Sequence, residues 1–452
     1  MFTSIDLFAG PGGLCTGFKW SGIKPLIAIE WSYWTVQTYS KTHNADIFNL
    51  DDYLNGKMQD VESFFRPNTN TLLIYGDINK VESALVKEIL NRRFGVESVD
   101  VVTGGAPCES FSMAGDRKED DDRNYLFMNI LRIARELDVP IILFENVKGL
   151  LSKKLKGIEG KMFEAICDEF EKKSRKTGVK YKLASRDKNE ILLKAINYGV
   201  PQLRERIFLV AINTKYKVQF VYPKPTHGYG TGVPYVTVGD ALLDLPQIGP
   251  GQESNEYNFD IDSIKENKRK EFIKIIRGIS KPVPSHLQFS NRSLSSHKTV
   301  NHRNNILQRI QLIQQGENMV SACERLAKEN VLDQFMHLFP KKLYAARNRR
   351  LQEGQYSFTV TSHCLDEMLH PRLNRALTPR EAARLQSFPD WYVFEGPYVK
   401  FHSDPQQDRY EQIGDAIPPL LAYNLGIEIS KTLEAIFPYR KEEIKQQESV
   451  AL

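Results

Sequence analysis

The residue best placed for chemistry is Cys108, in the stretch GGAPCESFS that covers residues 104–112. The apolar run VDVVT before it predicts a buried strand, and the glycines and proline predict that the chain turns there. Pro107 fixes its own backbone and disfavours helix at Ala106, so the cysteine is expected to be presented rather than packed. Because a thiolate is a good nucleophile, we expect Cys108 to act as one.

Charged residues follow two further apolar runs. Glu145 and Asn146 come directly after IILF, and a carboxylate at the end of a buried strand costs stability unless it is paired or protonated. A desolvated glutamate can donate a proton to a ring nitrogen. In YGVPQLRERIFLVA, Gln202, Arg204 and Arg206 alternate, so on an extended segment they would project to one side. Two guanidiniums beside an active site can lower a thiol pKa, whereas elsewhere they would form a solvated edge strand.

Ligand-binding groups are predicted at three strand ends near the N-terminus. The stretch DLFAGPGGL, residues 6–14, predicts a strand, a glycine turn and a helix, although it lacks the GxGxxG dinucleotide fingerprint. Glu30 ends the run PLIAIE, about one βα unit later, where it could hold ribose hydroxyls. Asp77 follows TLLIYG and could accept a hydrogen bond from an adenine amino group. Together they indicate an adenosine-containing cofactor; the alternative is three ordinary polar strand ends.

These groups need a scaffold, and the first 215 residues predict one. Short apolar runs alternate with amphipathic stretches such as NYLFMNILRIARELD and KMFEAICDEFEKKSRK. This alternation is typical of a doubly wound α/β sheet, which binds ligands at the carboxyl ends of its strands. The six predicted strands are SIDLFAG, PLIAIE, TLLIYGDI, VDVVTGG, IILFENV and RIFLVAIN.

The composition sets limits on the class of protein. The chain has 452 residues, of which 41% are hydrophobic, and a formal net charge of +5. This charge permits an anionic partner without requiring one. The five cysteines are odd in number, widely spaced and without a CxxC, which disfavours a disulfide framework or a zinc site: Cys15, Cys108, Cys167, Cys323 and Cys364. The cysteine spacing therefore predicts no metal site. The sequence shows no signal-like segment and no long apolar run, so we expect a cytoplasmic protein.

The pattern changes after about residue 220. Residues 265–309 hold eleven Lys or Arg against two acids, and KKLYAARNRR covers 341–350. Each run alone could be a solvated surface, but two runs in one irregular region favour a phosphate-facing surface. Thr378, Pro379 and Glu381 form the start of a capped helix, and PPLLAYNLGIEISKTLEAIF predicts a last helix packed on the large domain.

Six of these stretches, in order, resemble the motifs of the DNA (cytosine-5)-methyltransferase family, over residues 4 to about 430. They are DLFAGPGGL, GGAPCESFS, FENVKGL, NYGVPQLRERIFLVA, RALTPREAARLQSFPD and QIGDAIPPLLA. The resemblance implies a Rossmann-like S-adenosylmethionine-dependent methyltransferase sheet and a second, smaller, irregular target-recognition domain. We expect a catalytic and cofactor-binding domain at 1–218, target recognition at 219–400, a segment returning to the catalytic domain at 401–440, and a flexible tail at 441–452.

The family also implies roles for individual residues. Cys108 would add to C6 of a flipped-out cytosine, Glu145 would be the acid on the base, and Arg204 and Arg206 would support the nucleotide. The cofactor site would comprise Phe8, Gly10, Gly12, Leu14, Glu30, Trp31, Asp77, Ile78, Pro107, Leu126, Asp415 and Ala416. Asp415 stands where the family most often has Asn, and Glu109 where Gln is more usual.

The implied substrate is a specific sequence in double-stranded DNA, bound in the cleft between the domains. The expected protein is a monomeric bacterial or phage enzyme, the protective half of a restriction–modification pair whose endonuclease need not form a stable complex with it. One alternative is a tRNA cytosine-5 methyltransferase, although the long region at 220–370 favours duplex DNA. Another is a catalytically silent DNA-binding regulator, which the presence of Cys108 and Glu145 disfavours.

Overall fold

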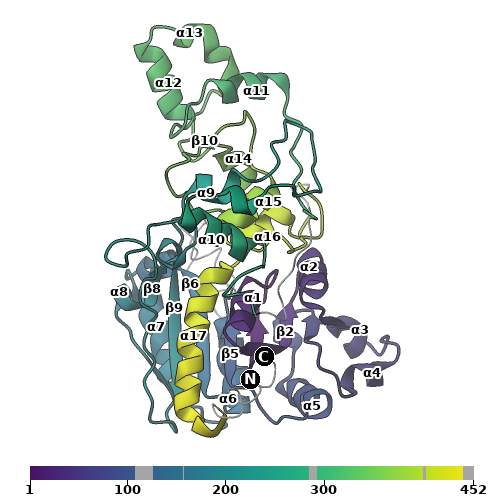
Figure 1. Ribbon diagram of the computed structural model, residues 1–452. Coiled ribbons are helices and arrows are strands. Elements are labelled where there is room, and N and C mark those ends of the chain that lie inside the picture. Colours follow the sequence, from purple (N-terminus) through teal and green to yellow (C-terminus); the bar gives the residue numbers. More distant parts are fainter. Residues whose placement is uncertain (107–125, 156, 285–292, 401–403, 441–452) are drawn as a thin grey trace. The chain divides into compact units, whose positions relative to one another are not determined.

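A computed structural model of the chain describes residues 1–106, 126–155, 157–284, 293–400 and 404–440 (Figure 1). The chain divides into two compact units. The first contains residues 1–194, 205–224 and 421–452, and the second contains 195–204 and 225–420. The chain therefore leaves the first unit before residue 205, returns to it for one long strand, and leaves again.

The first unit is built on a nine-stranded mixed sheet in the order β3-β4-β2-β1-β5-β6-β9-β7, with β8 also paired to β9. The strands from β3 to β6 are parallel, whereas β9 runs antiparallel to β6, and β7 and β8 run antiparallel to β9. Their bounds are β1 Phe2–Leu7, β2 Ile23–Glu30, β3 Asp46–Asn49, β4 Leu72–Tyr75, β5 Val101–Gly104, β6 Ile141–Val147, β7 Tyr181–Leu183, β8 Leu192–Lys194 and β9 Glu205–Asn213.

Helices cover this sheet on both faces. Side chains alternate across a strand, so Ile27 and Ile29 of β2 join a large core with α5 and α6, while Ala28 joins a second core with α1 and α2. The helices are α1 Gly13–Trp20, α2 Tyr33–His43, α3 Leu50–Leu54, α4 Val61–Phe65, α5 Ser83–Phe94, α6 Phe127–Leu137, α7 Lys161–Glu171 and α8 Lys188–Ile191. The expected α/β architecture is confirmed, including all six predicted strands.

The last helix, α17 Pro419–Ile436, packs on the first unit as expected (Figure 1). A Cβ at Gly426 would lie 2.1 Å from Ser21 Oγ, so only glycine allows this close approach to the end of α1. Ser430 Oγ donates a hydrogen bond of 3.0 Å to the Ser21 carbonyl. Helix α17 therefore packs closely against the end of α1.

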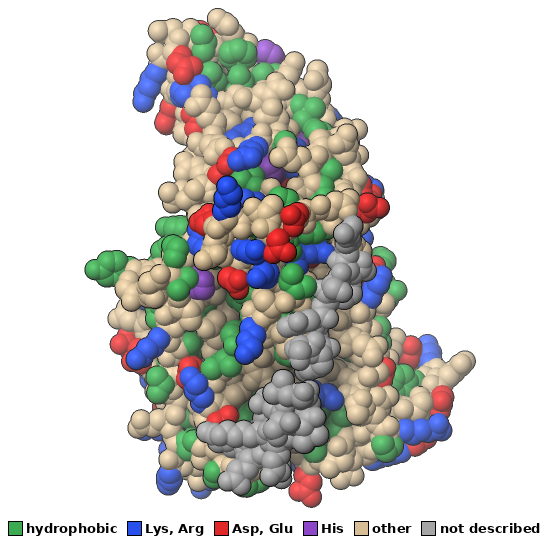
Figure 2. Space-filling model, viewed as in Figure 1, with side chains coloured by type: hydrophobic (Ala, Val, Ile, Leu, Met, Phe, Trp, Pro, Cys, Tyr) green, Lys and Arg blue, Asp and Glu red, His purple; other side chains and the backbone are tan. Residues whose placement is uncertain are grey.

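The second unit has short helices and long irregular connections. Its helices are α9 Val238–Leu242, α10 Asn267–Ile276, α11 Asn304–Gln311, α12 Met319–Lys328, α13 Leu332–Phe335, α14 Cys364–Glu367, α15 Pro379–Leu385 and α16 Arg409–Asp415. Two short parallel strands, β10 Arg349–Arg350 and β11 Met368–Leu369, pair there. A separate small core lies around α11 and α12. On the face shown in Figure 2, basic and acidic side chains are interspersed.

The compact units divide the chain differently from the boundaries that the sequence suggested. Residues 195–204 group with the second unit although they precede residue 218, and 404–420 group there too, although a return was expected from 401. The functional assignment of the units stays a prediction, and the proposed tail at 441–452 lies outside the described residues. Within the described ranges, no helix is long and apolar enough to cross a membrane, and no metal-binding cluster of His, Cys, Asp or Glu occurs.

Candidate active site

The turn after β1 leaves open space beside its backbone. Phe8, Gly10 and Gly12 have φ values of 59°, 55° and 98°, in the left-handed region that glycine adopts most easily. Phe8 holds this conformation without being glycine, which is a form of backbone strain found at binding sites. A Cβ built at Gly10 would meet nothing within 4 Å, whereas Leu14, the second residue of α1, is 5% exposed. The turn can therefore admit a ligand at Gly10.

The carboxylate of Glu30 is fixed beside this turn. Its Oε2 accepts a hydrogen bond of 2.9 Å from the Gly10 N–H, and its Oε1 accepts bonds of 2.9 Å from the N–H groups of Trp31 and Ser32. Burial raises the pKa of Glu30, and the backbone N–H groups oppose that rise. Because each carboxylate oxygen accepts more than one hydrogen bond, the group can still receive ligand hydroxyls. The neighbouring Trp31 side chain is 50% exposed.

The next strand end lies alongside. The Gly76 N–H donates to the Glu30 carbonyl at 3.0 Å, which places the end of β4 next to that of β2. Asp77 is exposed, and its Oδ1 accepts from the Asn79 N–H at 2.9 Å, while Ile78 is buried. The structure thus brings the glycine turn, Glu30 and Asp77 to one edge of the sheet.

The predicted nucleophile lies in a segment outside the described residues. Cys108, with Pro107 and Glu109, belongs to residues 107–125 and lies outside the described residues. The chain that leads to it is described as far as Ala106, whose carbonyl accepts a hydrogen bond of 3.4 Å from Asn146 Nδ2. Leu126, on the other side of the gap, is half-buried against the large core.

Glu145 lies beside the end of β5. A Cβ built at Gly105 would come within 2.7 Å of Glu145 Oε2, so the glycine leaves room for the carboxylate. The Glu145 Oε1 atom lies 3.1 Å from Arg206 Nε, and both side chains are about 15% exposed. Val147 of β6 pairs with Arg206 of β9, which puts Arg206 and Glu145 diagonally across the ladder on one face.

Arg204, the other arginine of this stretch, belongs to the second unit. The strand β9 begins at Glu205, and Arg204 is fully buried in the second unit, where its Nη1 donates to the Val360 carbonyl at 3.1 Å. Gln202 is also fully buried there and bonds to the backbone of Leu385 and Val360. Gln202 and Arg204 therefore both contact Val360, whereas Arg206, on the other side of the start of β9, lies beside Glu145.

Asp415 and Ala416 lie at the end of α16. The Asp415 Oδ2 atom accepts a hydrogen bond of 2.8 Å from Gln407 Nε2, and Ala416 is 6% exposed. Just before them, a Cβ at Gly414 would lie 2.2 Å from the carbonyl carbon of Thr361. This contact fixes the end of α16 against residues 361–362 within the second unit.

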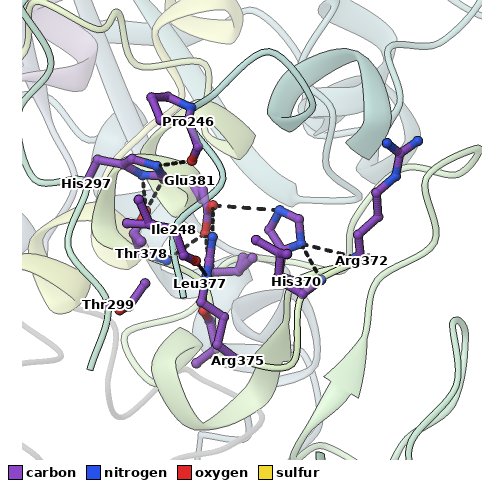
Figure 3. Close-up of polar contacts among 12 residues, drawn as sticks. Pro246, Ile248, His297, Thr299, His370, Arg372, Arg375, Leu377, Thr378 and Glu381 are labelled. Carbon is purple, nitrogen blue, oxygen red and sulfur yellow. Dashed lines mark hydrogen bonds and ion pairs between the residues drawn. The ribbon is translucent and has the colours of Figure 1, made fainter. Parts of the chain in front are cut away.

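A buried polar network supports the capped helix α15, as Figure 3 shows. The predicted capping box is confirmed, since Thr378 and Glu381 bond to each other's N–H groups. Arg375 donates two hydrogen bonds, of 2.8 and 2.7 Å, to the Glu381 carboxylate. His370 Nε2 lies 3.8 Å from the same carboxylate, and burial lowers the pKa of His370 to about 4. The contacts of Arg375 and His370 with Glu381 were not predicted from the sequence.

Asp6 is a buried acid that the sequence did not single out. Its Oδ1 accepts a hydrogen bond of 2.7 Å from Thr103 Oγ1, and its Oδ2 has no hydrogen-bond partner among the described residues. Burial raises its pKa to about 7, opposed by the Thr103 bond and supported by the nearby charge of Glu30. The available signal was an aspartate inside an apolar strand run, which is costly unless the group is neutral or paired.

Comparisons with known proteins show which family this sequence is similar to. The sequence model of a family described as C-5 cytosine-specific DNA methylase matches residues 2–65 and 53–431. M.DdeI, a Type II methyltransferase of Desulfomicrobium norvegicum, is 29% identical over 436 residues, which cover 96% of this chain and 89% of that protein. M.XorII, a Type II methyltransferase of Xanthomonas oryzae pv. oryzae, is 29% identical over 453 residues, covering 99% and 88%.

The fold also matches a solved structure. A prophage-encoded protein of E. coli, described as a DNA modification methyltransferase, superposes with a TM-score of 0.64 at 23% sequence identity. The superposition covers 96% of this chain and 100% of that one, and it shows a shared fold.

Proposed function

The chain belongs to the C-5 cytosine-specific DNA methylase family and is a DNA (cytosine-5)-methyltransferase, and from that premise we propose which of its residues carry the reaction. Cys108 is the nucleophile, Glu145 contacts the target base, and Arg204 and Arg206 support the flipped-out nucleotide. One observation carries the proposal: Glu145 lies against Gly105, three residues before Cys108, with Arg206 on its other carboxylate oxygen.

The reactivity of cytosine explains why such residues are needed. C5 is too weakly nucleophilic to be alkylated unaided, but addition of the Cys108 thiolate to C6 converts the ring to an enamine with electron density at C5. Glu145 assists that addition by protonating N3 or by a strong hydrogen bond to it. Loss of the C5 proton later breaks the bond from C6 to sulfur and frees Cys108. Since C6 is inaccessible in a stacked duplex, the base must leave the helix first.

The family uses S-adenosylmethionine, and the first unit has groups that fit it. When bound, this cofactor supplies the methyl group that becomes attached to C5. The buried Glu30 carboxylate suits the ribose hydroxyls, Asp77 suits the adenine amino group, and the open space at Gly10 suits a closely approaching ligand. The remaining proposed cofactor residues are Phe8, Gly12, Leu14, Trp31, Ile78, Pro107, Leu126, Asp415 and Ala416. No metal is proposed.

The substrate is proposed to be a specific sequence in double-stranded DNA, bound between a catalytic domain and a target-recognition domain. The relatives named Type II methyltransferases support a protective role in a bacterial restriction–modification system. We propose that the enzyme is a monomer, that it works on DNA in the bacterial cytoplasm, and that a cognate endonuclease is its functional partner without a stable complex. The match to a DNA methylase family favours DNA over tRNA as substrate.

Substitution of the nucleophile tests the proposal. Cys108→Ala should abolish methyl transfer to duplex DNA, because no thiolate is left to add to C6, while S-adenosylmethionine binding persists. Transfer of a labelled methyl group measures the first, and calorimetry measures the second. Cys323→Ala, which removes a buried thiol of the second unit, is the matched control and should stay active. Normal turnover by Cys108→Ala would refute the nucleophile assignment.

The substrate requires a separate test. Bisulfite sequencing of DNA from cells that express the protein should show methylation at cytosines within one short sequence. DNA carrying 5-fluorocytosine at that position should trap the wild-type enzyme covalently, because fluorine is not lost as a proton is. Methylation of tRNA and not of duplex DNA would overturn the proposed substrate.

A further inference from the structure

The two basic runs of the second unit differ in their ionic partners. In the run at 265–309, lysines and an arginine of α10 are already paired. The closest pairs are Lys268 with Asp240 at 2.7 Å, Lys270 with Asp262 at 2.9 Å and Arg277 with Asp390 at 3.0 Å, and longer pairs are Lys274 with Glu271 and Lys298 with Glu253. Five of the eleven cations of this run are therefore paired within the protein, whereas Lys265, Lys281 and Arg303 are exposed and make no ion pair with a described residue.

In the second run, the exposed cations without an ion pair lie within seven consecutive residues, 341–347. Lys341, Lys342 and Arg347 are exposed, and none of them makes an ion pair with any residue that the structure describes. They lie on the connection between α13 and β10, which we call the cationic loop and define as residues 341–347 (Figure 1). No acidic residue interrupts this loop. Its positive charge is available to an anion from outside.

An exposed tyrosine gathers two of these charges. Lys342 Nζ lies 5.0 Å and Arg347 Cζ 5.5 Å from the centroid of the Tyr344 ring, and Tyr344 is 45% exposed. Each cation is attracted to the ring by about 0.5–1 kcal/mol at an exposed site. Both cations therefore lie beside the same exposed ring, and a bound anion would be attracted to both of them.

Both ends of the cationic loop are anchored. Leu338 and Phe339 precede it and belong to the small core around α11 and α12. Arg350 follows it, is 4% exposed, and donates to the carbonyls of Ile310 and Ile313. A loop held at both ends loses less conformational freedom when its cations engage a ligand.

We propose that the cationic loop, rather than the paired lysines of α10, carries phosphate contacts of the second unit with duplex DNA. The inference rests on the proposed function, since DNA is the polyanion that this enzyme modifies. Lys342 and Arg347 would each neutralise a phosphate and release condensed counterions. Phosphate contacts of this kind fix the position of a protein on the duplex without reading its sequence.

The salt dependence of DNA binding tests the inference. Lys342→Gln combined with Arg347→Gln should reduce the slope of log K against log salt concentration by about 2, because each lost phosphate contact removes about 0.9. Affinities for duplexes with and without the methylated sequence should fall by the same factor. The matched control is Lys270→Gln with Lys274→Gln, which lowers the net charge equally but breaks internal ion pairs, and its slope should stay near that of the wild type.

Two outcomes would overturn the inference. One is a double variant of the cationic loop that keeps the full wild-type salt slope, while the wild type methylates duplex DNA. The inference about the loop would then be refuted, and the proposed function would be unaffected. The other is an α10 control that loses as much slope as the loop variant. A wild-type protein that methylates no DNA would instead refute the proposed function, and the inference with it. Because the side chains of Lys342 and Arg347 are exposed, the thermal midpoint of the loop variant should be unchanged.

Discussion

Gly105 controls the position of the Glu145 carboxylate. Gly105 directly follows β5 and Glu145 lies in the neighbouring parallel strand β6, and the missing side chain of Gly105 leaves the space that the carboxylate occupies. On its other side, Arg206 lies 3.1 Å from the carboxylate. A group that must meet one ring nitrogen has to be held within a fraction of an ångström, because catalysis depends on orientation.

We predict that Gly105→Ala lowers the methylation rate by about 100-fold, since its Cβ would displace the carboxylate by roughly an ångström. Single-turnover methyl transfer on duplex DNA measures this rate. The affinity for S-adenosylmethionine and the thermal midpoint should remain close to wild type, which separates a displaced Glu145 from a damaged fold. A Gly105→Ala enzyme with wild-type turnover would show that the carboxylate position is not critical.

Single residues were predictable from the sequence where a charged side chain stands at the end of a buried strand, because such a placement lowers stability unless the charge has a partner. A carboxylate straight after IILF pointed to Glu145, and a strand ending in Glu30 pointed to a ligand. The contact of Glu145 with Arg206 depends on the register of β6 against β9, which sixty residues of intervening chain do not reveal. The burial of Arg204 in the second unit has the same cause, because its partners lie near residue 360.

At the scale of elements, α16 depends on one close contact. Gly414 packs against the backbone of Thr361 and Ser362, where a Cβ would lie 2.2–2.3 Å from main-chain atoms. Backbone atoms cannot rotate away as a side chain can. Any residue larger than glycine must therefore move α16, together with Asp415 at its end.

We predict that Gly414→Ala lowers the free energy of unfolding by about 1–3 kcal/mol, the usual cost of overpacking. Urea denaturation followed by circular dichroism measures the change. Gly354→Ala is the matched control in the same unit, because its Cβ would meet nothing within 4 Å, and it should unfold like the wild type. Equal stability of the two variants would mean that α16 moves at no cost.

Elements were predictable in proportion to their length and apolar character. Runs such as PLIAIE and IILFENV became β2 and β6, and the sequence signal for the capped start of α15 held in detail. The strands β7 and β8 have three residues each and were missed, because so short a segment carries no periodic pattern. In the second unit, buried ion pairs such as Arg384 with Asp244 and Arg277 with Asp390 join segments far apart in the sequence, and sequence patterns do not show which charges meet.

At the scale of the whole molecule, two buried groups give stability opposite responses to pH. In the first unit the pKa of Asp6 is raised from 3.8 to about 7, so above pH 4 the folded chain holds a proton that the unfolded chain has lost. Stability therefore falls as pH rises toward 7, by about 4 kcal/mol in total. In the second unit the pKa of His370 is lowered from 6.5 to about 4 by burial, opposed by Glu381. Stability therefore falls as pH drops from 6.5 to 4, by about 3 kcal/mol.

These opposite slopes can be separated by substitution. Asp6→Asn keeps an oxygen that accepts the hydrogen bond from the Thr103 hydroxyl, but it does not titrate. It should therefore remove the fall in thermal midpoint that Asp6 causes between pH 4 and 7.5. The response that His370 causes should remain. His370→Asn keeps an acceptor for the N–H groups of Arg372 and Leu373, and it should flatten the loss below pH 6.5 instead. Thermal midpoints of both variants and the wild type, measured from pH 4 to 9, provide the comparison. Both groups titrate between about pH 4 and 7, so the sign of each difference from the wild type is the test. The signs deduced from burial would be wrong if the midpoint of Asp6→Asn fell relative to the wild type as pH rises, or if that of His370→Asn rose relative to it. If each variant loses its own slope and keeps the other, the two units carry independent pH responses, each arising from one buried group.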